Sequence, residues 1–161
     1  MATINVTAGS QAILTLGNTQ PLATPGAAGS LSIPFLQDVT ISAAPGTVRY
    51  STLDSSSSSA FTTVNENSVS CNMLVDDLVM FGNSSATTNS VALNGLFETS
   101  KAKTEIHFAV SFEGTGTTGD TFWRGTGFIG GLAPTASIDQ AVWISPMEII
   151  VNGELTKVDE S

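Results

Sequence analysis

Positive charge is the scarcest property of this sequence. Five of the 161 residues are lysine or arginine, against fourteen aspartates and glutamates, and the formal net charge is −9. The five cations are scattered, so no basic stripe is present that could hold nucleic-acid phosphates. We therefore expect no tight binding of nucleic acid by this chain alone. An acidic surface could face DNA only by repelling it.

Cysteine and histidine are almost missing. Cys71 and His107 are the only residues of their kinds, which excludes an internal disulfide and a zinc site built from several such ligands. A Ser-His-Asp triad would have to use His107, which stands mid-strand on a polar face, and no G-x-S-x-G elbow is present. Cys71 falls on an apolar face and is interpreted as a core residue. We expect no catalytic residue, no metal and no cofactor.

Long hydrophobic runs are lacking as well. No run approaches the roughly 20 residues that cross a membrane, and we expect no membrane partner. The first residues, MATINVTAGSQAILTLG, have neither the cationic start nor the continuous apolar core of a signal peptide. The length predicts a single domain over 1–161.

What the sequence does contain is strand-like alternation. In EIHFAVSF, four apolar residues fall on one face: Ile106, Phe108, Val110 and Phe112. In SVSCNMLVD, the apolar face carries Val69, Cys71, Met73 and Val75. Further strands are predicted in AILTL, SIPFLQDVTIS, AVWIS and MEIIV. Proline cannot donate to a β-ladder, so we expect the last strand to be bent, bulged or exposed at Pro146.

Two stretches between the strands are less regular. Residues 44–68 include five consecutive serines and predict a long polar loop. In NSVALNGLFETSKA, the spacing of Leu93, Leu96 and Phe97 predicts a short helix with Asn89 or Ser90 as its N-cap. Asn94-Gly95 is also a hairpin signal, and we prefer the helix.

The stretch WRGTGFIGGL contains Gly125-x-Gly127-x-x-Gly130, the spacing of a dinucleotide-binding loop. That loop needs a helix directly after it, and no helical periodicity follows Gly131. We interpret the glycines as positions where a strand bulges or another backbone approaches closely. Asp76-Asp77 is interpreted as a strand end running into a loop, because neighbouring strand residues point to opposite faces. The expected fold is mainly β, an antiparallel sandwich or barrel with one short α-helix and a long early loop.

From about residue 70 to 158 the order of these segments resembles the tail tube proteins of long-tailed bacteriophages. The resemblance comprises a strand ending in NMLVDDLV, a helix near VALNGLFETS, the strand TEIHFAVSF, an aromatic-glycine strand and a closing strand. Matching positions in the last two strands are Gly125, Gly127, Phe128, Ile129, Gly153, Leu155 and Thr156.

The resemblance implies a structural virion protein whose copies form stacked, usually hexameric, rings around a channel for ejected DNA. It implies partners among tail terminator, baseplate or sheath proteins, assembly in the host cytoplasm, and DNA that passes without specific binding. The early loop would reach an adjacent ring, with candidates Arg49, Tyr50, Asp54 and Ser57. Candidate acidic residues facing the channel are Asp76, Asp77, Glu105 and Glu113. The alternative is a phage fibre or lectin-like β-sandwich that binds a host receptor or glycan.

Overall fold

The computed structural model describes residues 12–18, 21–26, 29–54, 56–86, 89–113, 120–139 and 141–159. Its elements in chain order are β1 (Ile13–Gly17), β2 (Leu31–Ser32), β3 (Leu36–Tyr50), β4 (Ser59–Leu74), α1 (Asp77–Phe81), α2 (Ser90–Lys101), β5 (Glu105–Ser111), β6 (Thr121–Gly130) and β7 (Ile144–Asp159). The strands form one seven-stranded antiparallel sheet in the order β2-β1-β5-β6-β7-β4-β3. The prediction of a mainly β, antiparallel fold is confirmed.

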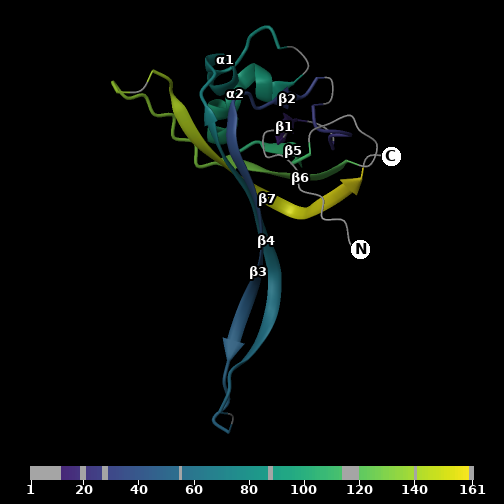
Figure 1. Cartoon of the computed structure of the whole chain (residues 1–161). Coiled ribbons are helices and arrows are strands. Elements are labelled where there is room, and N and C mark those ends of the chain that lie inside the picture. Colours follow the sequence, from purple (N-terminus) through teal and green to yellow (C-terminus); the bar gives the residue numbers. More distant parts are fainter. Residues whose placement is uncertain are drawn as a thin grey trace, which may run out of the picture.

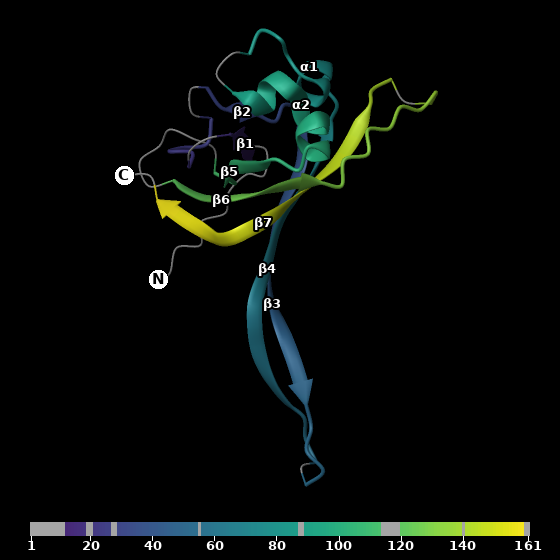
Figure 2. The ribbon, with the colours of Figure 1, turned by 180° about the vertical axis from the view of Figure 1, so that it is seen from behind.

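The main core lies between one face of this sheet and the two helices (Figures 1 and 2). Alternate residues of the central strands point into it, including Val69, Cys71 and Met73 of β4 and Phe108 of β5. The helices contribute Met80, Val91 and Leu96. The period-2 pattern in the sequence therefore identified the buried faces of β4 and β5 correctly. Phe112 was the exception, because β5 ends at Ser111 and the Phe112 side chain is exposed.

The sheet curls around this core. β1 and β3 contact each other although they are far apart in the strand order. The Ile33 amide donates to the Leu14 carbonyl at 2.9 Å, and the Leu74 amide donates to the Phe35 carbonyl at 3.2 Å. The chain between β2 and β3 thus links the first strand of the fold to the end of β4.

Residues 21–26 cover part of the opposite face, where β1, β5 and β6 meet. The Gly26 amide donates to the Thr15 hydroxyl at 2.9 Å, and the Arg124 guanidinium donates to the Leu22 carbonyl at 3.3 Å. Thr15 and Ala109 are fully buried there, outside the main core cluster. The rest of this face, toward β7, β4 and β3, has no such cover among the described residues.

The described residues form two helices where one was expected. Asp76 begins α1 as its N-cap, with its carboxylate accepting from the backbone amides of Leu78 and Val79 at 3.0 and 3.2 Å. The expectation that Asp76-Asp77 runs into a loop was therefore wrong. A five-residue helix is too short to show periodicity, and Asp at an N-cap is its one sequence signal.

The predicted helix is present as α2, and its N-cap is Asn89. The predicted buried face was wrong in part, because Leu93 and Phe97 are exposed while Val91 and Leu96 are buried. Gly95 explains the difference: its φ of 80° and ψ of 165° break the helix in the middle and shift the faces before and after it. The Asn94-Gly95 signal thus marks an interruption within the helix.

The polar loop predicted over 44–68 is for the most part a β-hairpin. Beyond the last β4–β7 pair, Ser68 with Ile150, β3 and β4 continue as a two-stranded extension that we call the arm, residues 44–66. It projects far from the rest of the sheet (Figure 1). Polar β-branched and aromatic residues form these strands without a core, which is why burial patterns did not identify them.

β6 runs through the glycine motif, and no helix follows it directly in the described chain. A Cβ at Gly127 would collide with the Ile150 carbonyl of β7, and one at Gly125 would lie 3.1 Å from the Phe108 ring. A bulge separates Arg124 from Thr126. The interpretation of these glycines as positions of bulging and close backbone approach is confirmed.

β7 continues through Pro146, which is exposed and pairs with Asn72 of β4. Pairing between β6 and β7 starts only at Glu148, so the proline lies where β7 has a neighbour on one side. No helix among the described residues is long and apolar enough to cross a membrane.

Candidate functional site

The uncovered part of the sheet presents a polar surface built from several strands. We call it the open face. Register and alternation place on it Asp38, Thr40, Ser42, Ser68, Ser70, Asn72, Glu105, His107, Thr126, Phe128, Gly130, Pro146, Glu148, Ile150 and Asn152. Most of these residues are small or polar, and those from β3, β4 and β7 are nearly all exposed.

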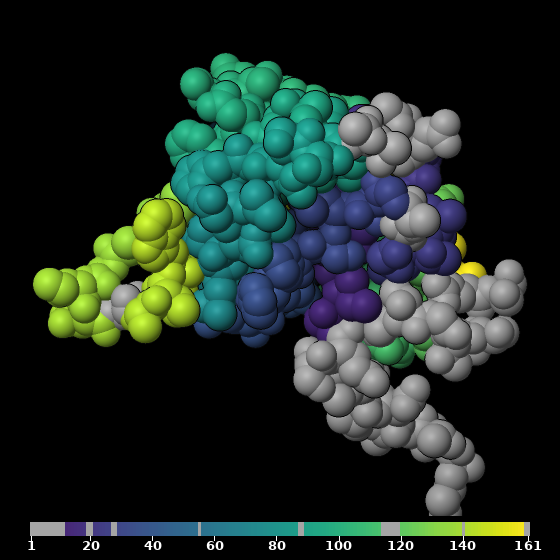
Figure 3. Space-filling model, turned by 90° about the horizontal axis from the view of Figure 1, so that it is seen from above, coloured from purple at the N-terminus to yellow at the C-terminus, as the bar shows by residue number. Residues whose placement is uncertain are grey.

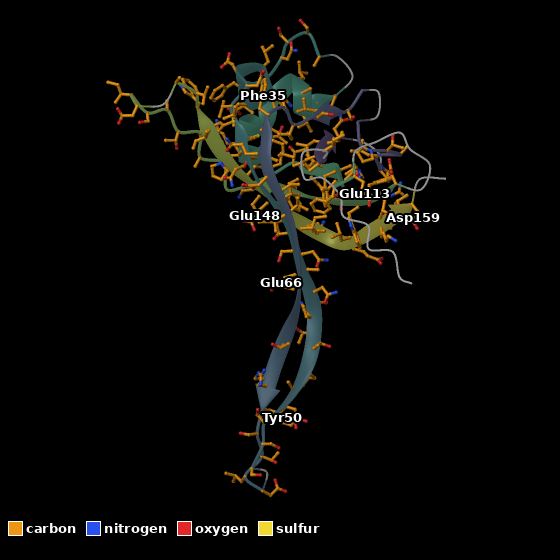
Figure 4. The ribbon with its side chains drawn as sticks, viewed as in Figure 1. Phe35, Tyr50, Glu66, Glu113, Glu148 and Asp159 are labelled. Carbon is orange, nitrogen blue, oxygen red and sulfur yellow. The ribbon has the colours of Figure 1, made fainter. Side chains whose placement is uncertain are left out.

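The open face carries negative charge. Asp38, Glu105 and Glu148 lie on it, and none of its described residues is lysine or arginine. The cation nearest in the strand order is Arg124, which the segment 21–26 covers. Figure 4 shows Glu148 near the middle of the sheet, at the level where the arm begins.

Two of the three carboxylates are held by hydrogen bonds along the sheet. Asp38 accepts from the backbone amide and from the side-chain amide of Asn72, at 3.0 and 2.8 Å. Glu105 accepts from the side-chain amide of Asn152 at 2.6 Å. Such bonds fix the direction of a carboxylate without neutralising its charge.

The structure does not bring the four predicted acidic residues together. Glu105 lies on the open face, whereas Asp76 caps α1 and Asp77 is the first residue of that helix. Glu113 follows β5 and accepts a hydrogen bond from the Thr121 amide at 3.1 Å, at the far side of the sheet from Glu148 (Figure 4).

Sequence reasoning missed Asp38 and Glu148. Glu148 sits in MEIIV, which reads as apolar on both faces, and it alternates there with the buried Met147 and Ile149. Asp38 likewise alternates with the half-buried Val39 and Ile41. Period 2 applied strictly to these two strands could have assigned both carboxylates to the polar face.

The four candidates for the inter-ring loop do lie together, near the far end of the arm. Arg49 and Tyr50 end β3, and Asp54 and Ser57 belong to the turn that leads to β4. A hydrogen bond from the Thr52 side chain, followed by one from the backbone, lowers the pKa of Asp54. Sequence reasoning missed Phe61, whose ring lies 6.1 Å from that of Tyr50 between centroids.

The isolated reactive side chains have structural surroundings. Cys71 is buried, and burial, with a smaller effect from the negative charge of Asp38, raises the pKa of its thiol to about 12. A thiol that stays protonated at neutral pH is a poor nucleophile and a poor metal ligand. No three His, Cys, Asp or Glu side chains in the described ranges are grouped so that they could hold a metal ion.

Comparison of the folds relates the chain to tubes and tails. The chain aligns with a protein of the tail of an empty gene transfer agent particle solved with C6 symmetry, at a TM-score of 0.62 and 16% identity, over 95% of this chain and 99% of the other. It aligns with the SPP1 tail tube protein at a TM-score of 0.66 and 12% sequence identity, over 96% of this chain and 80% of the other. A third match is a structure of the sheath/tube terminator of an extracellular contractile injection system. Its TM-score is 0.57 at 12% sequence identity, over 98% of this chain and 99% of the other.

At these identities the comparisons establish the fold. The chain has a tail-tube-like fold over nearly its whole length, and the predicted likeness is confirmed at that level. No protein-family model matches the sequence, and no curated protein sequence matches it.

Proposed function

We propose that this chain is a structural virion protein whose copies form stacked rings of six and so build the tail tube of a bacteriophage. The tube is a conduit for genome DNA during ejection, and the role of the chain is structural and not catalytic. The observation that carries this proposal is a tail-tube-like sheet with helices on one face and an acidic, uncovered opposite face. Assembly takes place in the host cytoplasm, and the product is part of the virion.

Strand edges supply the means of self-association. The outer edge of β3 has no neighbour in the described sheet, and the β4 edge over 59–67 is unpaired on the side away from β3. The β7 edge over 151–159 is unpaired on the side away from β6. Unpaired edges are templates for pairing with another chain, and a closed ring of identical subunits leaves none exposed.

The open face suits the wall of a channel that DNA traverses. Asp38, Glu105 and Glu148 would repeat around each ring, and Glu113 is a further candidate from the sequence. The other two candidates, Asp76 and Asp77, belong to α1, which packs on the opposite face of the sheet. The Debye length is about 8 Å at physiological salt, so such a wall repels phosphates that come near it. Without lysine or arginine on the wall, DNA lacks the contacts that would slow it.

The arm suits a contact between rings, and Arg49, Tyr50, Asp54 and Ser57 are the candidates for that contact. Every described residue of the arm except Gly46 is exposed, so the isolated chain gains little from folding it. Terminator, baseplate or sheath proteins would meet the ends or the outside of the tube.

Electron microscopy of negatively stained, purified chain at raised concentration tests the proposal. Hollow filaments of uniform width are expected. The matched variant replaces residues 45–65 by Asn-Gly, a two-residue turn that closes the Ala44–Glu66 pair. This variant should have the melting temperature of the parent chain. It should form at most single rings or short stacks, and no long tubes. Discrete trimers from the parent chain would favour the fibre instead and reject the proposal.

A further inference from the structure

A groove opens where β4 ends, beside the segment that precedes β7. Its volume is about 420 Å³, and apolar side chains dominate its lining: Phe35, Leu74, Val75, Val142 and Trp143, with Asp77 as a charged member. This volume falls among the roughly 300–1,000 Å³ of pockets that hold small ligands, so an aromatic side chain fits. Seen from above, residues 131–139 and 141–143 project at one side of the body (Figure 3).

Backbone hydrogen bonds preform the groove. The Leu74 amide donates to the Phe35 carbonyl at 3.2 Å, and the next amide, that of Val75, donates to the Trp143 carbonyl at 2.8 Å. The end of β4 is thereby tied to both walls. A site that is already shaped loses little entropy when it is filled.

Phe35 is held in an unfavourable state. Its φ is 53°, a left-handed conformation that costs a bulky residue energy, and 64% of it is exposed. Trp143 on the other wall is 48% exposed. Strain and exposed aromatic area gathered at one groove are features of a contact site that the isolated chain leaves empty.

The arm carries a matching surface. Val48, Tyr50 and Phe61 share one of its faces, and each is about half exposed. We call these three residues the aromatic face of the arm. Arg49, the only cation of the arm, adjoins Tyr50 in the chain and lies on the other face of the arm. Its charge is opposite to that of Asp77.

The arm cannot reach the groove of its own chain. Phe35 precedes β3 and Tyr50 ends it, so the whole strand separates them, about 50 Å at 3.3 Å per residue. Figure 4 shows the two side chains at opposite ends of the molecule. The only copy of the arm that can enter the groove is therefore that of another chain.

We propose that the aromatic face of the arm of one copy docks in the Phe35–Trp143 groove of a second copy, with Arg49 beside Asp77. The contact joins two different surfaces, so every subunit can give one arm and receive another, and the contact repeats without limit along an axis. This inference rests on the proposed self-assembly and names the acceptor site for it.

Cross-linking tests the docking directly. One chain carries Ser59→Cys, opposite Tyr50 on the arm, and another carries Ala141→Cys in the groove lining, so that Tyr50 and Trp143 stay in place. The two chains are mixed and oxidised, and native Cys71 does not compete because it is buried. A disulfide-linked heterodimer is expected, at least tenfold above the yield from Ser59→Cys mixed with Phe97→Cys on the exposed side of α2. A yield no higher than that control overturns the docking, whether or not tubes form. If tubes form without this cross-link, the docking is wrong and the proposed function is unaffected. If the cross-link forms without tubes, the docking is supported and the proposed tube is rejected.

Charge exchange tests it independently. Arg49→Glu and Asp77→Lys should each raise the protein concentration needed for assembly about fivefold, and the double variant should restore it. Tyr50→Ala and Trp143→Ala should each raise it about 30-fold, as for residues at the centre of an interface. Lys101→Glu, an exposed charge reversal outside both surfaces, is the matched control. Failure of the double variant to recover, with each single variant impaired and folded, contradicts the Arg49–Asp77 contact.

Discussion

The side-chain amide of Asn152 on β7 donates a 2.6 Å hydrogen bond to the Glu105 carboxylate on β5, across the strand β6 that separates them. The bond shows that the carboxylate is directed along the open face and not away from it. Thr126 on the intervening strand donates to the Asn152 carbonyl at 2.9 Å. Three strands are thus joined by side chains on the surface that we propose as the channel wall.

Reversing charge on the open face should make the tube retain DNA. We expect Glu148→Lys tubes assembled with a short DNA to protect several-fold more of it from nuclease than parent tubes do. The effect should disappear toward 1 M salt, where the Debye length is only about 3 Å. Glu98→Lys on exposed α2 is the control. Equal protection by the parent, Glu148→Lys and Glu98→Lys tubes would show that this face does not line the channel.

Two glycines of the same motif should respond differently to alanine. A Cβ at Gly127 meets the Ile150 carbonyl, whereas one at Gly130 has only the Glu148 carbonyl at 4.0 Å. We expect Gly127→Ala to lower the free energy of unfolding by about 1–3 kcal/mol or more, because the β6 and β7 backbones must separate. Gly130→Ala should change it by about 0.5 kcal/mol or less. Urea denaturation measures both, and equal losses would contradict the packing explanation.

The N-cap of α1 should depend on hydrogen bonding more than on charge. Asp76→Ala removes the acceptor for the Leu78 and Val79 amides and should cost about 1 kcal/mol, a fall of roughly 2–4 °C in Tm for a chain of this size. Asp76→Asn keeps an acceptor of similar quality and should recover most of the loss. Thermal melts of the unassembled chain decide this, and an Asn variant as unstable as the Ala variant would assign the effect to charge.

Cys71 should react with alkylating reagents only when the chain unfolds. Burial raises its thiol pKa to about 12 from an ordinary 9.0, so the folded chain binds the proton more tightly than the unfolded chain. The associated stability is fully present below about pH 9 and is lost as the pH rises through 12. We expect no iodoacetamide labelling at pH 8 without denaturant and rapid labelling in urea.

The loss of folding stability at alkaline pH can be tested with a Cys71 variant. Cys71→Ala should flatten the pH dependence of stability above pH 9, after allowance for the smaller side chain in the core. Native labelling of Cys71 within minutes would show that the thiol is accessible, and the linkage argument would then fail.

The alternation of apolar residues in the sequence was enough to predict β5 and the inner half of β4, because each has one face on a core. The sequence was also enough to interpret Gly125 and Gly127 as positions of bulging and close backbone approach, since no helical pattern follows them. The two candidate caps, Asn89 and Ser90, located the start of α2, and Asn89 is the cap. Elements outside the core were harder: the strands of the arm bury nothing, and α1 is shorter than two helical turns.

The sequence by itself determined the central strands, their buried faces and the excess of negative charge. Only the tertiary structure decided that Asp38, Glu105 and Glu148, from three different strands, share one uncovered face. The tertiary structure also placed Phe35 and Trp143 on two sides of one groove. It placed the aromatic face of the arm too far away to enter the groove of its own chain. Local residue patterns determine which face of a strand is apolar, but pairing register and the curl of a sheet set which distant residues meet, and these depend on the whole chain.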